Sequence, residues 1–273
     1  TMNGADLWIQ QNAPEFNYVS AGSFPVSQYL LPLFNGFSSN VIFIIERTAW
    51  WLHIIGILCF LNYLYYSKHL HILLAFPNTY FANLNAKGKL SNLKSVTNEV
   101  KMMLDPSIDP YASTSSVEVS KFGASDVFDL SKIQLLNAYT CTECGRCTSE
   151  CPANQTGKKL SPRKIMMDTR DRMEVVGNNI DVNNGEFKPD GKELLGDYVT
   201  NEELWACTSC NACVEACPIG IDPLSIIMDM RRYLVMEKSD APSELNNMMS
   251  NIENNGAPWP FNQMDKLNWK NEI

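Results

Sequence analysis

The sequence predicts a mainly α-helical chain, in which a transmembrane helix is followed by a helical domain built around cysteines. A long apolar run occupies residues 41–66, and eight of the nine cysteines fall in two tight groups after residue 140. Few alternating apolar and polar runs occur after residue 120, where helical patterns dominate. These patterns cover residues 126–139, 161–175, 200–206 and 222–237.

We therefore expect five parts in the chain. They are an extracytoplasmic loop (1–40), a transmembrane and juxtamembrane helix (41–84), a linker (85–120), the cysteine domain (121–240) and a C-terminal extension (241–273). The first part is rich in Pro, Ser, Gly and aromatic residues, and its only charges are Asp6 and Glu15. Within it, residues 29–34 could form an interfacial or re-entrant piece.

The composition excludes one class of partner and favours one kind of site. The formal net charge is −8, which argues against nucleic acid as a ligand. Disulfide scaffolds spread their cysteines along the chain, whereas metal-binding sites bunch them. The bunching here indicates metal in a reducing compartment. Cys59 stands alone in the apolar run and is expected to be a packing residue.

The apolar run meets the length that a bilayer requires. A spanning helix needs about 20 mostly apolar residues, and residues 48–66 satisfy this. Tryptophans lie near one end and tyrosines near the other, as is typical of the two membrane interfaces. The alternative is a buried helix of a soluble protein. After the run, residues 67–84 are predicted to leave the membrane and to break at Pro77.

Lysines set the predicted orientation of this helix. Few positive charges other than Arg47 precede the run, whereas several lysines follow it closely. Because positive charge is retained on the cytoplasmic side, the N-terminal side is expected outside and the cysteine domain in the cytoplasm. The lysines concerned are Lys68, Lys87, Lys89, Lys94 and Lys101.

Each cysteine group has the spacing C-x2-C-x2-C-x3-C-P, which holds [4Fe-4S] clusters. Three cysteines two residues apart can wrap one cluster, while the proline directs the chain away after the fourth. In two-cluster ferredoxins the fourth cysteine therefore binds the other cluster. The alternative is two tetrahedral zinc sites, which usually use separated C-x2-C pairs. The predicted ligands are Cys141, Cys144, Cys147 and Cys217 for cluster I, and Cys207, Cys210, Cys213 and Cys151 for cluster II.

The three histidines lie in or near the apolar run. On one continuous helix, His53 and His71 would share a face because eighteen residues make five turns, whereas His69 would point away. Two aligned histidines near opposite sides of a bilayer could each ligate a haem b. The alternative is that His53 bonds a neighbouring group and that His69 and His71 are interfacial.

No other motif in the sequence indicates catalysis. The nucleotide-binding motifs G-x-G-x-x-G and G-x-x-x-x-G-K-[ST] are absent. Ser161 and Pro162 are expected to begin a helix, as its cap and its first residue. Arg231 and Arg232 are expected to form a solvated face or a partner contact.

The cysteine domain resembles a known family. The stretches CTECGRCTSECPANQTGKKLSPRKIM, ELWACTSCNACVEACPIGIDPLSIIMDMRRYLVMEKS and NNGAPWPFNQMDKLNW are similar to the dicluster domain of heterodisulfide reductase-like (Fe-S)-binding membrane oxidoreductases. The stretch WWLHIIGILCFLNYLYYSKHLHILLAFPNTYF resembles the last helix of the haem b membrane subunit of respiratory nitrate reductase. The second resemblance implies that His53 and His71 each bind a haem b, completed by histidines outside this chain.

The resemblance implies electron transfer in a bacterial cytoplasmic membrane. Electrons would pass between a cytoplasmic redox partner, the two clusters, and haem b or quinone in the membrane, with a flavoprotein or a Cys-Cys-Gly domain protein as partner. Relatives often continue into Cys-Cys-Gly domains and have more membrane helices, so partner subunits supply those parts or the chain is a piece of a longer polypeptide. Two other readings are a catalytic disulfide- or hydroxyacid-handling enzyme whose active site lies in a missing domain, and an assembly subunit with vestigial clusters.

Overall fold

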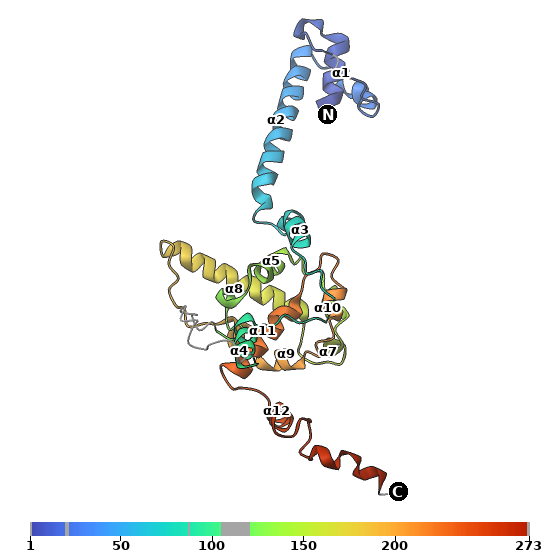
Figure 1. Cartoon of the computed structure of the whole chain (residues 1–273). Coiled ribbons are helices and arrows are strands. Elements are labelled where there is room, and N and C mark those ends of the chain that lie inside the picture. Colours follow the sequence, from blue (N-terminus) through green and yellow to red (C-terminus); the bar gives the residue numbers. More distant parts are fainter. Residues whose placement is uncertain (1, 20–21, 87, 105–120, 272–273) are drawn as a thin grey trace. The chain divides into compact units, whose positions relative to one another are not determined.

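The computed structural model describes residues 2–19, 22–86, 88–104 and 121–271. Its regular elements are helices, and no strand occurs among the described residues, which confirms the predicted mainly α-helical class (Figure 1). The chain divides into two compact units, Thr1–Leu70 and His71–Ile273. The candidate membrane helix lies in the first unit and the cysteine motifs lie in the second.

The first unit begins with helices where a loop was predicted. Helix α1 (Met2–Asn12) and the 3-10 helices η1 (Pro14–Phe16) and η2 (Ser27–Phe34) precede α2 (Ser39–Leu64). Small and apolar side chains four residues apart form one stripe along α1, and this stripe packs against η2 and the start of α2. The spacing rather than the polar composition therefore decided the structure. The buried residues are Ala5, Ile9, Ala13, Phe34 and Ile42.

A polar cluster ties the N-terminal segment to α2. The Tyr18 hydroxyl donates a 2.7 Å hydrogen bond to Oε2 of Glu46, a residue that is only 4% exposed. Arg47 Nε donates to the same carboxylate oxygen at 2.5 Å. Because a buried carboxylate is costly without partners, these contacts compensate the burial of Glu46.

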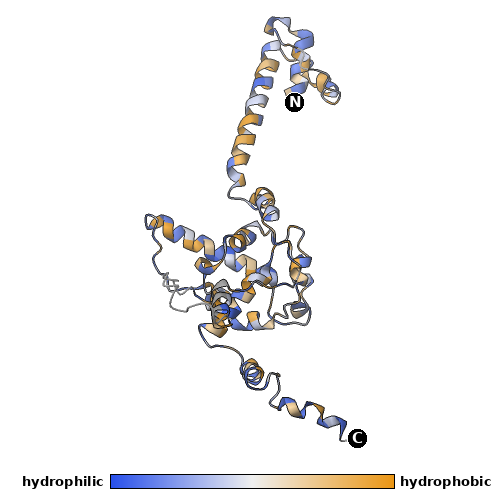
Figure 2. Cartoon of the chain, viewed as in Figure 1, coloured by the Kyte–Doolittle hydropathy of each residue, from blue (hydrophilic) through white to orange (hydrophobic). Residues whose placement is uncertain are grey.

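Helix α2 is the candidate membrane span. Its 26 residues are apolar enough to cross a bilayer and reach about 39 Å, against a hydrocarbon core of about 30 Å. Most of its large apolar side chains are exposed. Figure 2 shows hydrophobic residues, coloured orange, along this helix. Among the described residues it is the one helix that meets these criteria of length and composition.

The helix breaks earlier than predicted. Helix α2 ends at Leu64, and α3 begins at Leu70 and runs to Tyr80, so the expected break at Pro77 is wrong. Ser67 stabilises the turn between them, since its hydroxyl donates to the Leu64 carbonyl and accepts from the His69 N–H. Such local side-chain bonds compete with helix continuation.

A further helix lies within the predicted linker. Helix α4 spans Lys94–Leu104, whereas residues 105–120 lie outside the described part of the chain. Leu93, Val96 and Val100 have helical spacing, and they line one shallow cavity with Arg232 and Met236 of the cysteine domain. Apolar contact with the folded domain explains why this polar stretch is helical.

The predicted helices of the cysteine domain are present, with altered limits. The region 126–139 divides at Ser131, whose side chain accepts from the Gln134 N–H in a capping box and so starts a new helix. Ser161 and Pro162 begin a helix as expected. The elements are η3 (Val127–Asp129), α5 (Lys132–Thr140), α6 (Arg146–Ser149), α7 (Pro152–Gln155), α8 (Pro162–Val182), η4 (Leu194–Tyr198), α9 (Asn201–Ala206), α10 (Ala212–Glu215) and α11 (Pro223–Met236).

The core of this domain lies where α8 contacts α5 and α11. Arg172 of α8 is fully buried, and its guanidinium binds Asp126 at 2.7 Å and Asp190 at 2.5 Å. It also donates to the Lys192 carbonyl, which fixes the long loop after α8. A buried charge paired on two sides holds three distant segments in one arrangement.

The C-terminal extension consists of α12 (Ser243–Asn255) and the 3-10 helix η5 (Gln263–Lys270). Gly256 ends α12 with φ of 66°, a left-handed conformation that suits glycine. Large side chains such as Trp259, Phe261 and Trp269 are exposed here.

Candidate functional site

The two cysteine motifs have the same backbone conformation. Each follows a helix that ends at its first cysteine, and each passes through two left-handed residues into a four-residue helix. The left-handed residues are Glu143 (φ 60°) and Gly145 (φ 82°) before α6, and Ser209 (φ 55°) and Asn211 (φ 62°) before α10. These conformations curl the backbone back on itself, as ligand loops require. Helices α6 and α10 pack against each other and thereby join the motifs.

Cysteines of both motifs meet around one cavity. It has a volume of about 240 Å³ and is lined by Cys141, Cys144 and Cys147 of the first motif and by Cys217 of the second. Cys213 also reaches its wall. Apolar side chains complete the lining, namely Met166, Pro218, Ile219, Ile221 and Pro223.

The thiols of this first set interact electrostatically. Burial raises the pKa of Cys141, and the charges of Cys217 and Cys144 raise it further. Burial also raises the pKa of Cys147, and the charges of Cys141, Cys144 and Cys217 raise it further. Crowded, buried thiolates repel one another, so this arrangement favours a group that brings positive charge between them.

A second set of thiols is grouped in the same crossed manner. Burial raises the pKa of Cys207, whose neighbours include Cys151 of the first motif and Cys210 of its own. Burial raises the pKa of Cys213 to about 12, and the charges of Cys207 and Cys151 contribute to the rise. The structure thus brings Cys217 to the cavity of the first motif, and it brings Cys151 near Cys207 and Cys213 of the second.

Backbone N–H groups point to two of the sulfurs. The Ser209 N–H donates to Cys207 Sγ at 3.4 Å, and the Ile221 N–H donates to Cys217 Sγ at 3.4 Å. Hydrogen bonds of this kind stabilise negative sulfur and tune the potential of a cluster bound to it. The donor set and its surroundings therefore fit two iron–sulfur clusters.

Arg231 has a different role from the one predicted. Its guanidinium donates to the carbonyls of Leu204 and Cys207 at 2.5 Å, and it lies over the Trp205 ring. Burial lowers its pKa. Arg231 therefore secures the loop that carries the second motif and is not a solvated residue. No pattern in the sequence marks it, because its partners are backbone carbonyls 24 to 27 positions away.

Arg232 is also held by its own chain. Its guanidinium donates to the Asp229 carboxylate at 2.8 Å and to the Ser91 carbonyl. The side chain is only 18% exposed, so the expectation of a solvated face is wrong for this residue as well. The contact with Ser91 links α11 to the segment that precedes α4.

The three histidines lie on different elements of the chain. His53 is exposed on α2, and His69 lies in the turn beside the Phe60 ring. His71 lies on α3 and lines the cavity of the first cysteine set. The predicted alignment of His53 and His71 on one helix is therefore wrong, because the helix is interrupted at residues 65–69. Haem ligation by these residues stays a prediction.

Helix α3 packs closely on the loop that follows Cys217. Asn78 Nδ2 donates a 2.9 Å hydrogen bond to the Ile219 carbonyl. A Cβ added to Gly220 would lie 3.6 Å from Cβ of Ala82, so small residues meet at this contact. No pattern in the sequence predicts that residues 70–80 pack beside the loop of Cys217.

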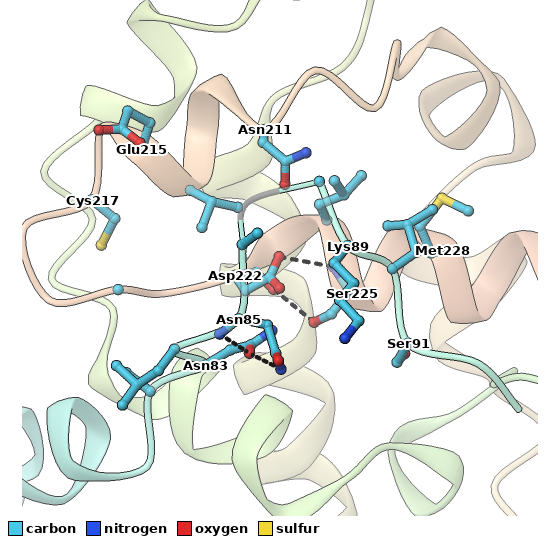
Figure 3. Close-up of a pocket in the computed structure, with 18 of the residues that line it drawn as sticks. Asn83, Asn85, Lys89, Ser91, Asn211, Glu215, Cys217, Asp222, Ser225 and Met228 are labelled. Atoms are coloured by element: carbon cyan, nitrogen blue, oxygen red, sulfur yellow. Dashed lines mark hydrogen bonds between the residues drawn. The ribbon is translucent and has the colours of Figure 1, made fainter. Parts of the chain in front are cut away.

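A second cavity, of about 420 Å³, lies beside the second motif (Figure 3). Cys217 and Asn211 line it from the motif, and residues of the segment after α3 line its other side. Asp222 caps α11 by accepting from the Ser225 N–H, and burial raises the pKa of its carboxyl. Cys217 thus lies at the wall shared by both cavities.

Comparisons with known proteins agree with this geometry. Residues 140–221 match the family model described as a 4Fe-4S dicluster domain. The chain is 30% identical over 92% of its length to a probable iron–sulfur-binding oxidoreductase of Bacillus subtilis, and covers 37% of that protein. It is 27% identical over 98% of its length to an EtfAB:quinone oxidoreductase of Syntrophomonas wolfei, again covering 37%.

A third relative is a probable membrane-anchored ferredoxin of Chromohalobacter salexigens, 34% identical over 51% of this chain and 23% of the relative. Subunits of heterodisulfide reductases also match the cysteine region. The chain thus spans little more than a third of the length of the first two relatives. It contains a 4Fe-4S dicluster domain and is related to iron–sulfur oxidoreductases that include heterodisulfide reductase-like proteins.

Proposed function

We propose that this chain is the electron-transfer part of a membrane oxidoreductase. Two [4Fe-4S] clusters connect a redox partner in the cytoplasm with haem b or quinone in the membrane. The observation that carries the proposal is the approach of Cys217 to the first motif and of Cys151 to Cys207 and Cys213 of the second. Cluster I takes Cys141, Cys144, Cys147 and Cys217, and cluster II takes Cys207, Cys210, Cys213 and Cys151.

The spacing of the thiols supports clusters rather than zinc. A single zinc ion needs its sulfur ligands at about 2.3 Å, and hence close to one another. Structural zinc usually uses two separated C-x2-C pairs, whereas both motifs have the full run C-x2-C-x2-C-x3-C-P that is typical of [4Fe-4S] ligands. The first set also surrounds a cavity.

The protein residues supply binding, shielding and tuning. When bound, [4Fe-4S] clusters accept and release single electrons. The thiolates hold them, the apolar wall around Met166 and Ile221 limits water, and the N–H groups of Ser209 and Ile221 favour negative sulfur. Shared contacts of α6 and α10 keep the two sets side by side, which suits transfer between them.

The membrane side of the proposal rests on α2 and on the relatives. Helix α2 is long and apolar enough to span a bilayer. One relative is described as a quinone oxidoreductase and another as a membrane-anchored ferredoxin, which supports a membrane acceptor or donor. Haem b held by His53 and a partner histidine from outside this chain is the other proposed membrane group, whereas His71 lines the cavity of the first cysteine set.

A second candidate function is catalytic. In this candidate the chain is a portion of a heterodisulfide reductase-like or hydroxyacid-oxidising enzyme whose Cys-Cys-Gly domain is missing here. The matches to heterodisulfide reductase subunits and the partial coverage of the longer relatives favour it. Isolation of the assembled protein with its partners, followed by identification of any Cys-Cys-Gly domain, separates the two candidates.

Metal analysis of the full chain tests the clusters. About eight iron and eight sulfide per chain are expected from two cubanes. Cys217→Ala should damage the cluster held by the first three cysteines of the first motif, whereas Cys59→Ala, a matched change in α2, should leave both clusters intact. Stoichiometric zinc without broad visible absorbance would refute the proposal, and damage confined to the other cluster would refute the crossed assignment.

A further inference from the structure

Helix α3 has two distinct faces. His71, Ala75 and Asn78 recur at intervals of four and three residues, so they share one face of the helix. This face meets the first cysteine set, because His71 and Ala75 line its cavity and Asn78 binds the Ile219 carbonyl.

The opposite face is apolar and exposed. Ile72, Leu73, Phe76 and Tyr80 fall within about 100° of arc around the helix. Phe76 is 73% exposed and Tyr80 is 82% exposed, and Phe81 and Leu84 extend the surface beyond the helix. A contiguous group of large, exposed apolar side chains indicates an interaction surface.

The position of α3 in the chain identifies what covers this face. Helix α3 begins six residues after the last residue of α2, so the connection spans at most about 20 Å. Any bilayer crossed by α2 therefore lies within reach of α3. Aromatic side chains suit the membrane interface, and Lys68 just before α3 suits anionic headgroups.

We propose that α3 is an interfacial helix whose outer face lies in the lipid headgroup region. Its inner face then holds the first cysteine set against the membrane, so this set is the one nearer to the bilayer. The proposal rests on the proposed function, in which α2 crosses the membrane and the two cysteine sets hold clusters. A helix of this kind can bury its apolar face in the lipid while its other face packs on the cysteine domain.

Photocrosslinking in a defined bilayer tests the lipid contact. The full chain, reconstituted in vesicles of phosphatidylcholine and phosphatidylglycerol, would carry photoreactive benzoylphenylalanine in place of Phe76 or, separately, Tyr80. The control places it at Phe128, an exposed phenylalanine (56%) of the cysteine domain. Mass spectrometry should find phospholipid adducts at positions 76 and 80, at least tenfold more than at position 128.

Three results would overturn the proposal. These are equal lipid adducts at all three positions, no adduct at 76 and 80, or adducts to protein in place of lipid. Iron and sulfide content, measured on the same samples, keeps the two proposals distinguishable. Lipid adducts in a chain without clusters would sustain the interfacial helix and refute the proposed cluster function.

Discussion

Asn78 Nδ2 donates a hydrogen bond of 2.9 Å to the carbonyl of Ile219, two residues after Cys217. Asn78 is only 2% exposed, so this bond lies within the packed contact between α3 and the second motif. A helix that closely follows the candidate membrane span is thereby fixed to the loop of a predicted cluster ligand.

Asn78→Ala should disturb one cluster selectively. The change leaves the half-buried Ile219 carbonyl without its donor, at a cost of about 1 kcal/mol, and loosens the loop of Cys217. We expect an altered electron paramagnetic resonance signal for cluster I, with cluster II unchanged. Asn83→Ala is the matched control, because exposed Asn83 contacts only Asn85 through its side chain. Equal spectra for both variants would contradict the coupling.

His71→Leu should lower the midpoint potential of cluster I. His71 lines the cavity of the first cysteine set, and its replacement by an apolar side chain removes a polar donor while the wall stays covered. His71→Gln, which retains an N–H donor, should restore much of the potential. Redox titration monitored by electron paramagnetic resonance measures both. The same potential in all three proteins would show that His71 does not tune the site.

Arg172→Met should destabilise the cysteine domain strongly. The variant leaves Asp126 and Asp190 facing each other without their buried partner, a loss of about 3–5 kcal/mol. The thermal midpoint for loss of visible absorbance should fall by several degrees. Lys159→Met, which removes an exposed ion pair with Glu202, should shift it little. Similar thermal midpoints for the two variants would show that the buried ion pairs of Arg172 stabilise the domain no more than the exposed pair of Lys159.

The cysteine domain should face the cytoplasm. Lysines follow the candidate span closely, whereas few positive charges precede it. Protease added to intact cells should spare residues beyond 121, and the same protease should cleave them in inverted membrane vesicles. A periplasmic and a cytoplasmic marker protein control for integrity. Cleavage in intact cells would reverse the orientation.

Local features were predictable because neighbouring residues alone determine them. The spacing C-x2-C-x2-C-x3-C-P predicts a cluster site without reference to the rest of the fold, and residues 140–221 match a dicluster domain. The Ser161 cap and the apolar length of α2 were read in the same way. Each depends on contacts or dimensions within one short segment.

Features that depend on distant contacts were not predictable. Residues 1–40 form helices because α1 finds an apolar partner in η2 and α2, and α4 is helical beside the folded domain. Arg231 binds carbonyls far along the chain, where no side-chain pattern records the partner. In each case the polar composition of the segment predicted solvent exposure, and packing decided otherwise.

The sequence by itself determined the two cysteine motifs, the candidate span and the mainly helical class, since these follow from local spacing and hydrophobic length. Only the tertiary structure decided where α2 ends and what α3 does. A turn closed by Ser67 separates His53 from His71, and the packing of α3 on the Cys217 loop brings His71 to the first cysteine set. Helical periodicity predicts which residues share a face within one helix, but it cannot relate residues on either side of a turn.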